Sequence, residues 1–202
     1  MILQLAGLLM PYLTVGLGLY VFHNAWVAIL AYHAGILLIL WIARFKNPAP
    51  FRITIPIWKL LAFAILGGIG AIAMWVLWPY VFVSPSLTGT LEQWELTRES
   101  WPMFIAYSAL VNPWLEELYW RGWLGSAARF PVAKDAFFAG FHLVILAPFV
   151  SIAWLIVIFI ILTITAWLWR QVTRRTMSLL PSALCHLAAD VSILLAIVSE
   201  VT

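Results

Sequence analysis

Apolar stretches long enough to cross a hydrocarbon core of about 30 Å as helices recur along the chain, separated by short connectors that hold most of its polar residues. We therefore predict an all-α fold, a polytopic transmembrane helix bundle of about seven spans. The predicted spans are Ile2 to Phe22, Ala25 to Ala43, Ile57 to Val83, Trp101 to Ala128, Pro131 to Phe149, Val150 to Trp169 and Ser178 to Val198. The first lacks a basic n-region, so we expect a retained helix and not a signal peptide.

The length of the fifth span is compatible with two interpretations. Its uninterrupted apolar stretch, Ala136 to Phe149, has a length that also occurs in buried or re-entrant helices. Without this crossing, however, the basic residues that follow Trp169 would lie outside the cell, against the usual excess of Lys and Arg in cytoplasmic connectors. We therefore expect the segment to cross.

The basic residues also indicate the orientation of the bundle. They surround the second, fourth and sixth connectors, which seven alternating spans place on one side: Arg44, Lys46, Arg52, Lys59, Arg129, Lys134, Arg170, Arg174 and Arg175. Because Lys and Arg mark the cytoplasmic side, we predict a cytoplasmic N-terminus and an extracytoplasmic C-terminus. The net charge of +3 does not indicate nucleic-acid binding, since these residues lie in connectors and not on one face or tail.

Composition agrees with a membrane protein. Hydrophobic residues make up 65% of the 202 residues and charged residues only 9%, whereas a soluble domain has about 25% charged residues. Aromatic residues at span ends are expected at the level of the lipid headgroups: Trp78, Tyr80, Trp94, Trp101, Trp167 and Trp169. Glycines inside spans are expected to let helices approach closely: Gly16, Gly18, Gly67, Gly68 and Gly70.

Ionisable residues inside the apolar spans are candidates for function, because each costs at least about 2.5 to 3.5 kcal/mol to insert. The run from Asn112 to Arg121 contains two adjacent carboxylates, Glu116 and Glu117. Glu117 and Arg121 share a helical face at i, i+4 and can pair, while Pro113 interrupts the helix just before them. The alternative is an interfacial helix end whose charged groups snorkel to water.

Two further polar pairs lie in the following spans. Phe138 and His142 are one turn apart in the fifth span, and His186 and Asp190 are one turn apart in the seventh. Counted from the nearest basic residue at about 1.5 Å per residue, Glu116, His142 and His186 lie about 20, 12 and 16 Å deep. At such depths the three side chains can meet in one layer.

The ordered motifs Glu116-Glu117-x-x-x-Arg121, Phe138-x-x-x-His142 and His186-x-x-x-Asp190 resemble those of the CAAX-protease and bacteriocin-processing family of intramembrane proteases. That family includes the eukaryotic CAAX prenyl endopeptidase. The resemblance covers roughly Trp101 to Val198 and implies a single transmembrane domain, 1–202. Its catalytic core would be 101–198, with a polar cavity between the C-terminal helices, while 1–100 carries spans without diagnostic motifs.

The resemblance implies an endopeptidase that cleaves a membrane-associated peptide or protein in the lipid bilayer, with no cofactor and no metal. Glu116 and His142 would activate a water molecule, and His186 would donate to the oxyanion. The supporting residues would be Glu117, Arg121 and Phe138. The short loops suit a prokaryotic member in the cell's inner membrane.

Asp190 departs from the commonest pattern of the family, which has Asn at this position. An ionised carboxylate cannot donate a hydrogen bond. Asp190 must therefore either be protonated or accept a hydrogen bond from His186. We expect the second, in which Asp190 orients the His186 ring as part of the catalytic set.

Other functions compatible with these residues remain open. Glu116, His142 and His186 are a possible His2Glu ligand set for catalytic zinc, although the chain has no HExxH motif. The same polar residues would also suit a proton-coupled transporter or a non-catalytic immunity or scaffold protein. The single cysteine, Cys185, excludes an internal disulfide and is expected to be a packing residue. His33, in the second span, is expected to be structural.

Overall fold

A computed structural model describes residues 2–46, 49–82 and 87–201 of the chain. Every regular element in these ranges is helical, which confirms the all-α prediction. The elements are α1 (Ile2–Tyr20), α2 (Ala25–Ile42), α3 (Ile57–Val81), α4 (Leu87–Gln93), α5 (Trp101–Glu116), the π-helix η1 (Glu117–Trp123), α6 (Ala133–Leu146), α7 (Ile152–Thr176) and α8 (Leu180–Val201).

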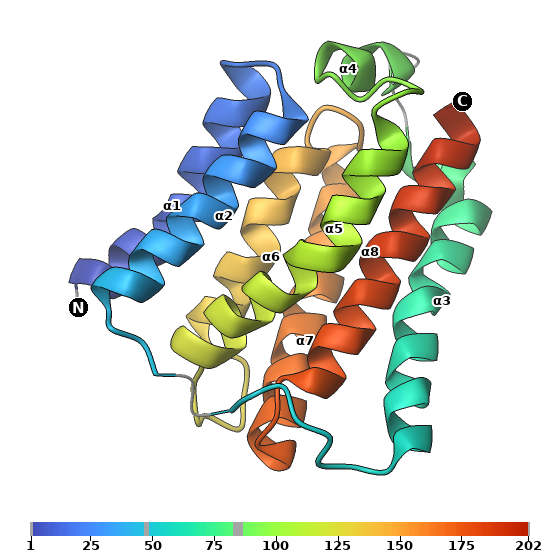
Figure 1. Cartoon of the computed structure of the whole chain (residues 1–202). Helices are drawn as coiled ribbons and strands as arrows, with labels where there is room; N and C mark the ends of the chain where they lie inside the picture. Colours follow the sequence, from blue (N-terminus) through green and yellow to red (C-terminus); the bar gives the residue numbers. More distant parts are fainter. Residues whose placement is uncertain (1, 47–48, 83–86, 202) are drawn as a thin grey trace.

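The long helices run side by side between two ends of the molecule (Figure 1). The connectors α2–α3, α5–α6 and α7–α8 lie at the lower end in this view, and the short α4 covers the upper end. The helix α1 starts at the lower end, and α8 finishes at the upper end beside α4. The three connectors predicted to share one side of the membrane therefore lie at one end of the bundle.

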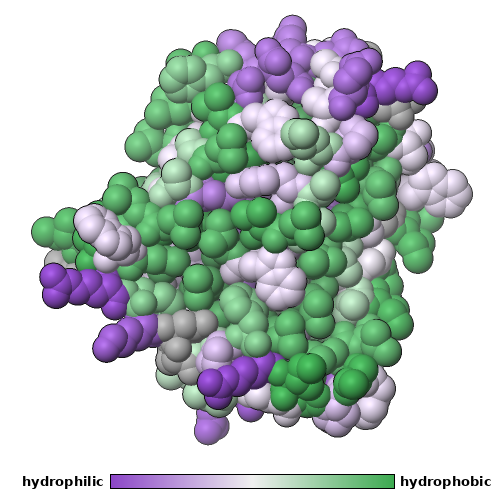
Figure 2. Space-filling model, in the orientation of Figure 1, coloured by the Kyte–Doolittle hydropathy of each residue, from purple (hydrophilic) through white to green (hydrophobic). Residues whose placement is uncertain are grey.

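The outer surface of the bundle is suited to lipid. Hydrophobic side chains form a broad band across its middle, and hydrophilic residues gather toward the two ends (Figure 2). Several large apolar side chains are more than half exposed, among them Leu5, Leu38, Trp58, Ile72 and Ile160. Soluble monomers rarely expose apolar patches beyond a few hundred Å², so this surface indicates an integral membrane protein.

Five helices in the described ranges are long and apolar enough to span a membrane: α1, α2, α3, α7 and α8. The predicted count of seven is therefore not confirmed. The α5 helix has 16 residues and continues directly into η1. The α6 helix has 14 residues, about 21 Å at 1.5 Å per residue, which is shorter than a hydrocarbon core.

Several predicted span boundaries differ from the helices. The fourth span was expected to reach Ala128, but η1 ends at Trp123. The sixth was expected to end at Trp169, but α7 continues to Thr176. Arg170, counted as a connector charge, therefore lies inside α7, where it is 3% exposed and pairs with the buried Asp135. The predicted end of the third span, Val83, lies outside the described residues.

Close helix approach occurs at two of the five glycines predicted to permit it. A Cβ at Gly18 would overlap the Ala28 backbone, so α1 and α2 touch there, and a Cβ at Gly67 would overlap the Cys185 carbonyl, where α3 meets α8. Gly16 and Gly68 face open space, and a Cβ at Gly70 would make only an ordinary contact with Ile193 on α8. The expectation of close helix approach is therefore correct for Gly18 and Gly67 and wrong for Gly16 and Gly68.

Three of the aromatic residues expected at the headgroups are instead buried within the protein: Trp94, Trp101 and Trp169. The Trp94 ring packs edge-on against Phe149, with 5.3 Å between ring centroids. Its backbone carbonyl accepts the N–H of Ala25 at 2.9 Å. These contacts fix the segment after α4 to the start of α2.

Candidate active site

The two glutamates lie where α5 becomes a π-helix. Pro113, which has no N–H to donate, stands one turn before the junction, and η1 begins at Glu117. π-Helical turns are rare and frequently occur at functional sites. Glu116 is 2% and Glu117 0% exposed, so the alternative of an interfacial helix end with snorkelling side chains is wrong.

Glu117 and Arg121 form the predicted i, i+4 ion pair. Arg121 Nη1 lies 3.2 Å from Glu117 Oε1, and both side chains are buried. The guanidinium group also lies over the rings of Phe138, at 4.0 Å, and Trp169, at 4.9 Å. These cation–π contacts connect η1 with α6 and α7.

His186, on α8, has a carboxylate beside each ring nitrogen. Nδ1 lies 3.2 Å from Glu117 Oε1, while Nε2 lies 3.8 Å from Glu116 Oε2 and 3.4 Å from Asp190 Oδ1. The Trp169 ring covers the imidazole, with 4.7 Å between centroids. The structure thus brings together Glu116 and His186, two of the three side chains predicted to meet in one layer, and places Asp190 one turn along α8 beside His186.

His142 reaches the cluster through aromatic contacts. Its Nδ1 donates to the Phe138 carbonyl at 2.8 Å, which leaves Nε2 of a neutral ring as an acceptor. The Phe138 ring contacts both histidines, at centroid distances of 4.7 Å to His142 and 6.2 Å to His186. Within the described ranges, no hydrogen bond or ion pair joins His142 directly to Glu116.

Two carboxylate oxygens of the cluster are buried without a hydrogen-bond partner among the described residues: Glu116 Oε2 and Glu117 Oε2. Unsatisfied buried polar atoms are uncommon in native proteins and are often associated with chemistry or bound water. Glu116 Oε2 is also the oxygen that faces His186 Nε2. The cluster therefore offers an acceptor that the protein itself does not use.

Three residues at or beside the cluster had no predicted role in it: Asn112, His33 and Trp169. Asn112 Nδ2 donates to Asp190 Oδ2 at 2.9 Å, and Asn112 Oδ1 lies 3.0 Å from His33 Nε2. The third is Trp169, which covers both Arg121 and His186. Asn112 lies four residues before Glu116, on the same helical face. This spacing could have predicted from the sequence that Asn112 lies near the cluster. The others come from distant helices and carry no such signal.

The side chains do not form a ready-made metal site. Across the described ranges, no group of three or more His, Cys, Asp or Glu side chains has the arrangement needed to hold a metal ion. The proposed zinc set of Glu116, His142 and His186 is therefore not assembled as a ligand triad in this arrangement of the helices.

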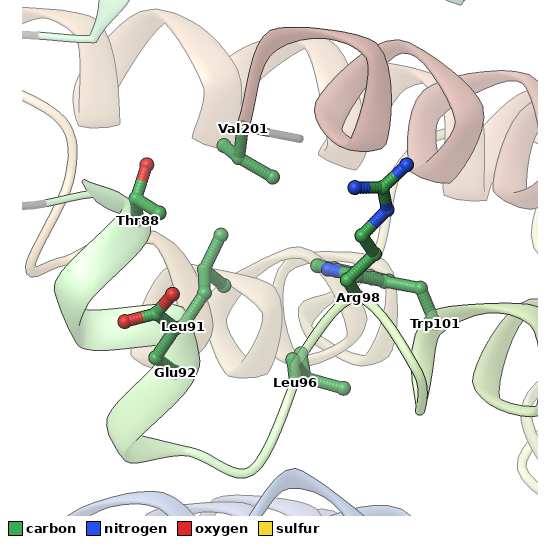
Figure 3. A pocket seen from close by; sticks show the side chains of 7 residues that line it. All are labelled: Thr88, Leu91, Glu92, Leu96, Arg98, Trp101 and Val201. Atoms are coloured by element: carbon green, nitrogen blue, oxygen red, sulfur yellow. The ribbon is translucent and has the colours of Figure 1, made fainter.

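Two surface pockets lie away from the cluster. One, of about 210 Å³, lies between α4, the start of α5 and the end of α8 (Figure 3). Its charged lining residues, Glu92 and Arg98, come from different segments, and their charged ends are not directed toward each other. The other, of about 560 Å³, is lined by residues 40–42, 44 and 45. Neither pocket includes a predicted site residue.

The part of the chain that contains this cluster matches a known protein family. Residues 98–192 match the model of the family described as type II CAAX prenyl endopeptidase Rce1-like. This stretch is Rce1-like. The match covers slightly less than half of the chain and confirms the resemblance drawn from the three motifs. No curated protein and no solved structure matches the chain.

The Rce1-like segment extends from just before α5 into α8 and so contains all the predicted site residues. The family's description is that of an endopeptidase, so the match indicates a protease of the CAAX type. The apolar spans and this match together indicate an integral membrane enzyme.

Proposed function

We propose that the protein is an intramembrane endopeptidase that hydrolyses a peptide bond with a water molecule activated by Glu116 and His142. The observation that carries the proposal is the unpartnered Glu116 Oε2, buried and 3.8 Å from His186 Nε2. A carboxylate oxygen that makes no hydrogen bond within the protein is available to take a proton from water. Burial among apolar helices keeps other solvent away from it.

In the proposed reaction, Glu116 removes a proton from water, and the water oxygen attacks the carbonyl carbon of the scissile bond. The carbonyl oxygen becomes an oxyanion, to which the single N–H of His186 Nε2 would donate in place of Asp190. When the carbon–nitrogen bond breaks, the proton held by Glu116 passes to the leaving nitrogen. The immediate products are a carboxylic acid and an amine, which become a carboxylate and an ammonium group when the acid's proton passes to the amine, and Glu116 returns to its ionised form.

The remaining residues would hold these groups in position. The free Nε2 of His142 would accept a hydrogen bond from the same water, because its Nδ1 is occupied by the Phe138 carbonyl. Glu117 would accept from His186 Nδ1, and Arg121 would balance the charge of Glu117. Such partners keep a reactive side chain in one orientation.

We propose a membrane-associated peptide or protein as the substrate, in a prokaryotic cell membrane. Glu116 lies 15 residues along α5 from Trp101, or about 22 Å at 1.5 Å per residue. A substrate must therefore enter the bilayer region of the protein to reach it. The family's description as prenyl endopeptidases supports a substrate held at the membrane.

The test is peptide cleavage by the full chain purified in detergent, using a library of membrane-associated peptides. Glu116→Gln keeps the side-chain shape but removes the base, so we expect kcat to fall by about 100-fold or more. Glu92→Gln changes an exposed glutamate on α4 and is expected to cleave like wild type. Equal cleavage by Glu116→Gln and wild type would exclude this mechanism.

The cleavage assay, together with a transport measurement in vesicles, separates the peptidase from the zinc-dependent and transporter alternatives. Cleavage that disappears on chelation and returns with zinc would favour the zinc peptidase. Absence of cleavage, together with transport in vesicles that depends on a proton gradient, would favour the transporter. Cleavage by purified protein that is insensitive to chelation supports the proposal.

A further inference from the structure

The polar contacts of the candidate site extend beyond the Rce1-like segment to α2. His33 is 3% exposed, and both of its ring nitrogens have polar partners on α5. Nδ1 lies 2.8 Å from Tyr107 Oη, and Nε2 lies 3.0 Å from Asn112 Oδ1. These contacts join a helix that the family match does not include to the helix that carries Glu116.

Hydrogen-bonding capacity fixes the direction of this chain of contacts. Asn112 Nδ2 donates to Asp190 Oδ2, so Asn112 Oδ1 is the acceptor facing His33. His33 Nε2 must then carry the proton, which makes Nδ1 of the neutral ring an acceptor for the Tyr107 hydroxyl. Reversing the Asn112 amide would place its oxygen against the Asp190 carboxylate, with no proton between them. With a neutral His33 ring, this one protonation pattern satisfies every contact.

The chain of contacts ends beside the proposed oxyanion donor. Asp190 faces His186 through Oδ1 at 3.4 Å and is held through Oδ2 by Asn112 at 2.9 Å. The Asp190 side chain is 22% exposed, so protein packing alone does not enclose it. The Asn112 amide is therefore a main restraint on the direction of the carboxylate.

We propose that His33 is a positioning residue of the active site, acting through Asn112 on Asp190 and so on His186. This inference rests on the proposed peptidase function. A kinetic expectation distinguishes this positioning role from simple helix packing. Loss of the His33 donor should lower the rate of the chemical step and leave substrate binding unchanged. The reason is that His186 is proposed to contact the oxyanion only as it forms.

The experiment compares His33→Phe with His33→Gln in the peptide-cleavage assay. Phe keeps a planar ring but has no donor, so we expect kcat to fall about 10-fold with KM unchanged, as for loss of one well-placed hydrogen bond. Gln retains an N–H for Asn112, and we expect kcat within about 3-fold of wild type. In an Asn112→Ala background, where the connection to Asp190 is already broken, His33→Phe should lower kcat no further.

Tyr12→Phe is the matched control. It removes a hydrogen bond between helices, from Tyr12 Oη on α1 to the Phe137 carbonyl at 2.8 Å, without touching the chain of contacts from His33. We expect its kcat and KM to match wild type. If His33→Phe does not fold, Tyr107→Phe, which removes the donor to His33 Nδ1, should lower kcat about 3-fold and again only when Asn112 is present.

Besides unchanged kinetics in His33→Phe, two results would overturn the inference. One is a rise in KM with kcat unchanged, and the other is an equal loss from His33→Phe with and without Asn112. Failure of the proposed function is distinguished from both, because wild type itself would then not cleave or Glu116→Gln would remain active. Wild-type cleavage lost in Glu116→Gln but unchanged in His33→Phe would contradict only the role of His33.

Discussion

At the scale of single residues, most ionisable groups of the cluster lie against another polar or aromatic side chain. Arg121 balances Glu117 and lies against two aromatic rings, and His186 lies between Glu117 and Asp190. The motif spacing predicted the pairs within one helix, since i, i+4 neighbours share a face. It did not predict Asn112 as the partner of Asp190, because that contact depends on how α5 and α8 are rotated toward each other.

Replacing Asp190 with Asn tests whether its charge is needed. The carboxylate has an oxygen for each of two donors, Asn112 and His186, whereas the amide of Asn has only one acceptor oxygen. We therefore expect Asp190→Asn to lower kcat by about 10-fold through the loss of one hydrogen bond. The measurement is steady-state cleavage by purified variants. Full activity would show that the charge is dispensable.

At the scale of elements, the segment between η1 and α6 is fixed by a side chain from α7. Arg170 makes two hydrogen bonds to Asp135, at 2.9 and 2.7 Å, and also donates to the carbonyls of Ser126, Ala128 and Phe130. Asp135 in turn accepts the N–H of Val132 at the start of α6, as a first-turn carboxylate can. These bonds connect the helix that carries Arg121 to the helix that carries His142.

Removing this connection is expected to destabilise the fold. Arg170→Met leaves a buried Asp135 carboxylate without its cation, which typically costs about 3 to 5 kcal/mol. Thermal unfolding of the purified protein in detergent measures the loss. Arg175→Met, at an exposed position one turn further along α7, should change the stability by less than about 0.5 kcal/mol.

A companion variant checks the cause of this effect. Arg170→Met combined with Asp135→Leu removes the orphaned charge, so it should regain part of the lost stability. If the double variant is less stable than Arg170→Met alone, the unpaired Asp135 is not the source of the loss.

At the scale of the whole molecule, the course of the helices brings the basic connectors to one end of an apolar bundle (Figures 1 and 2). The candidate site is enclosed: Glu116, Glu117 and His186 are buried, while His142 and Asp190 are less covered. A substrate carbonyl can reach Glu116 only where neighbouring helices separate.

The predicted orientation can be tested by labelling introduced cysteines with a membrane-impermeant thiol reagent. Glu95 lies in the segment after α4, and Arg175 lies near the end of α7, at opposite ends of the bundle. We expect Glu95→Cys to react in intact cells and Arg175→Cys to react only after permeabilisation, because basic connectors face the cytoplasm. The native Cys185 is buried and serves as an internal blank. The reverse pattern would invert the topology.

The sequence by itself determined the membrane location, the helical class and the helices that carry the candidate site. These properties depend on local quantities: the length of an apolar stretch, the position of a charge and the spacing of two residues along one helix. That is why the three motifs sufficed to recognise the Rce1-like segment before any contact was known.

Only the tertiary structure decided which polar residues meet. His33 was expected to be structural, Trp169 interfacial and Arg170 a connector charge, yet they contact Asn112, His186 and Asp135, respectively. Each contact depends on the rotation and depth of two helices distant in the chain. A side chain's partner across the bundle leaves no periodic signal in the sequence, whereas a partner one turn away does.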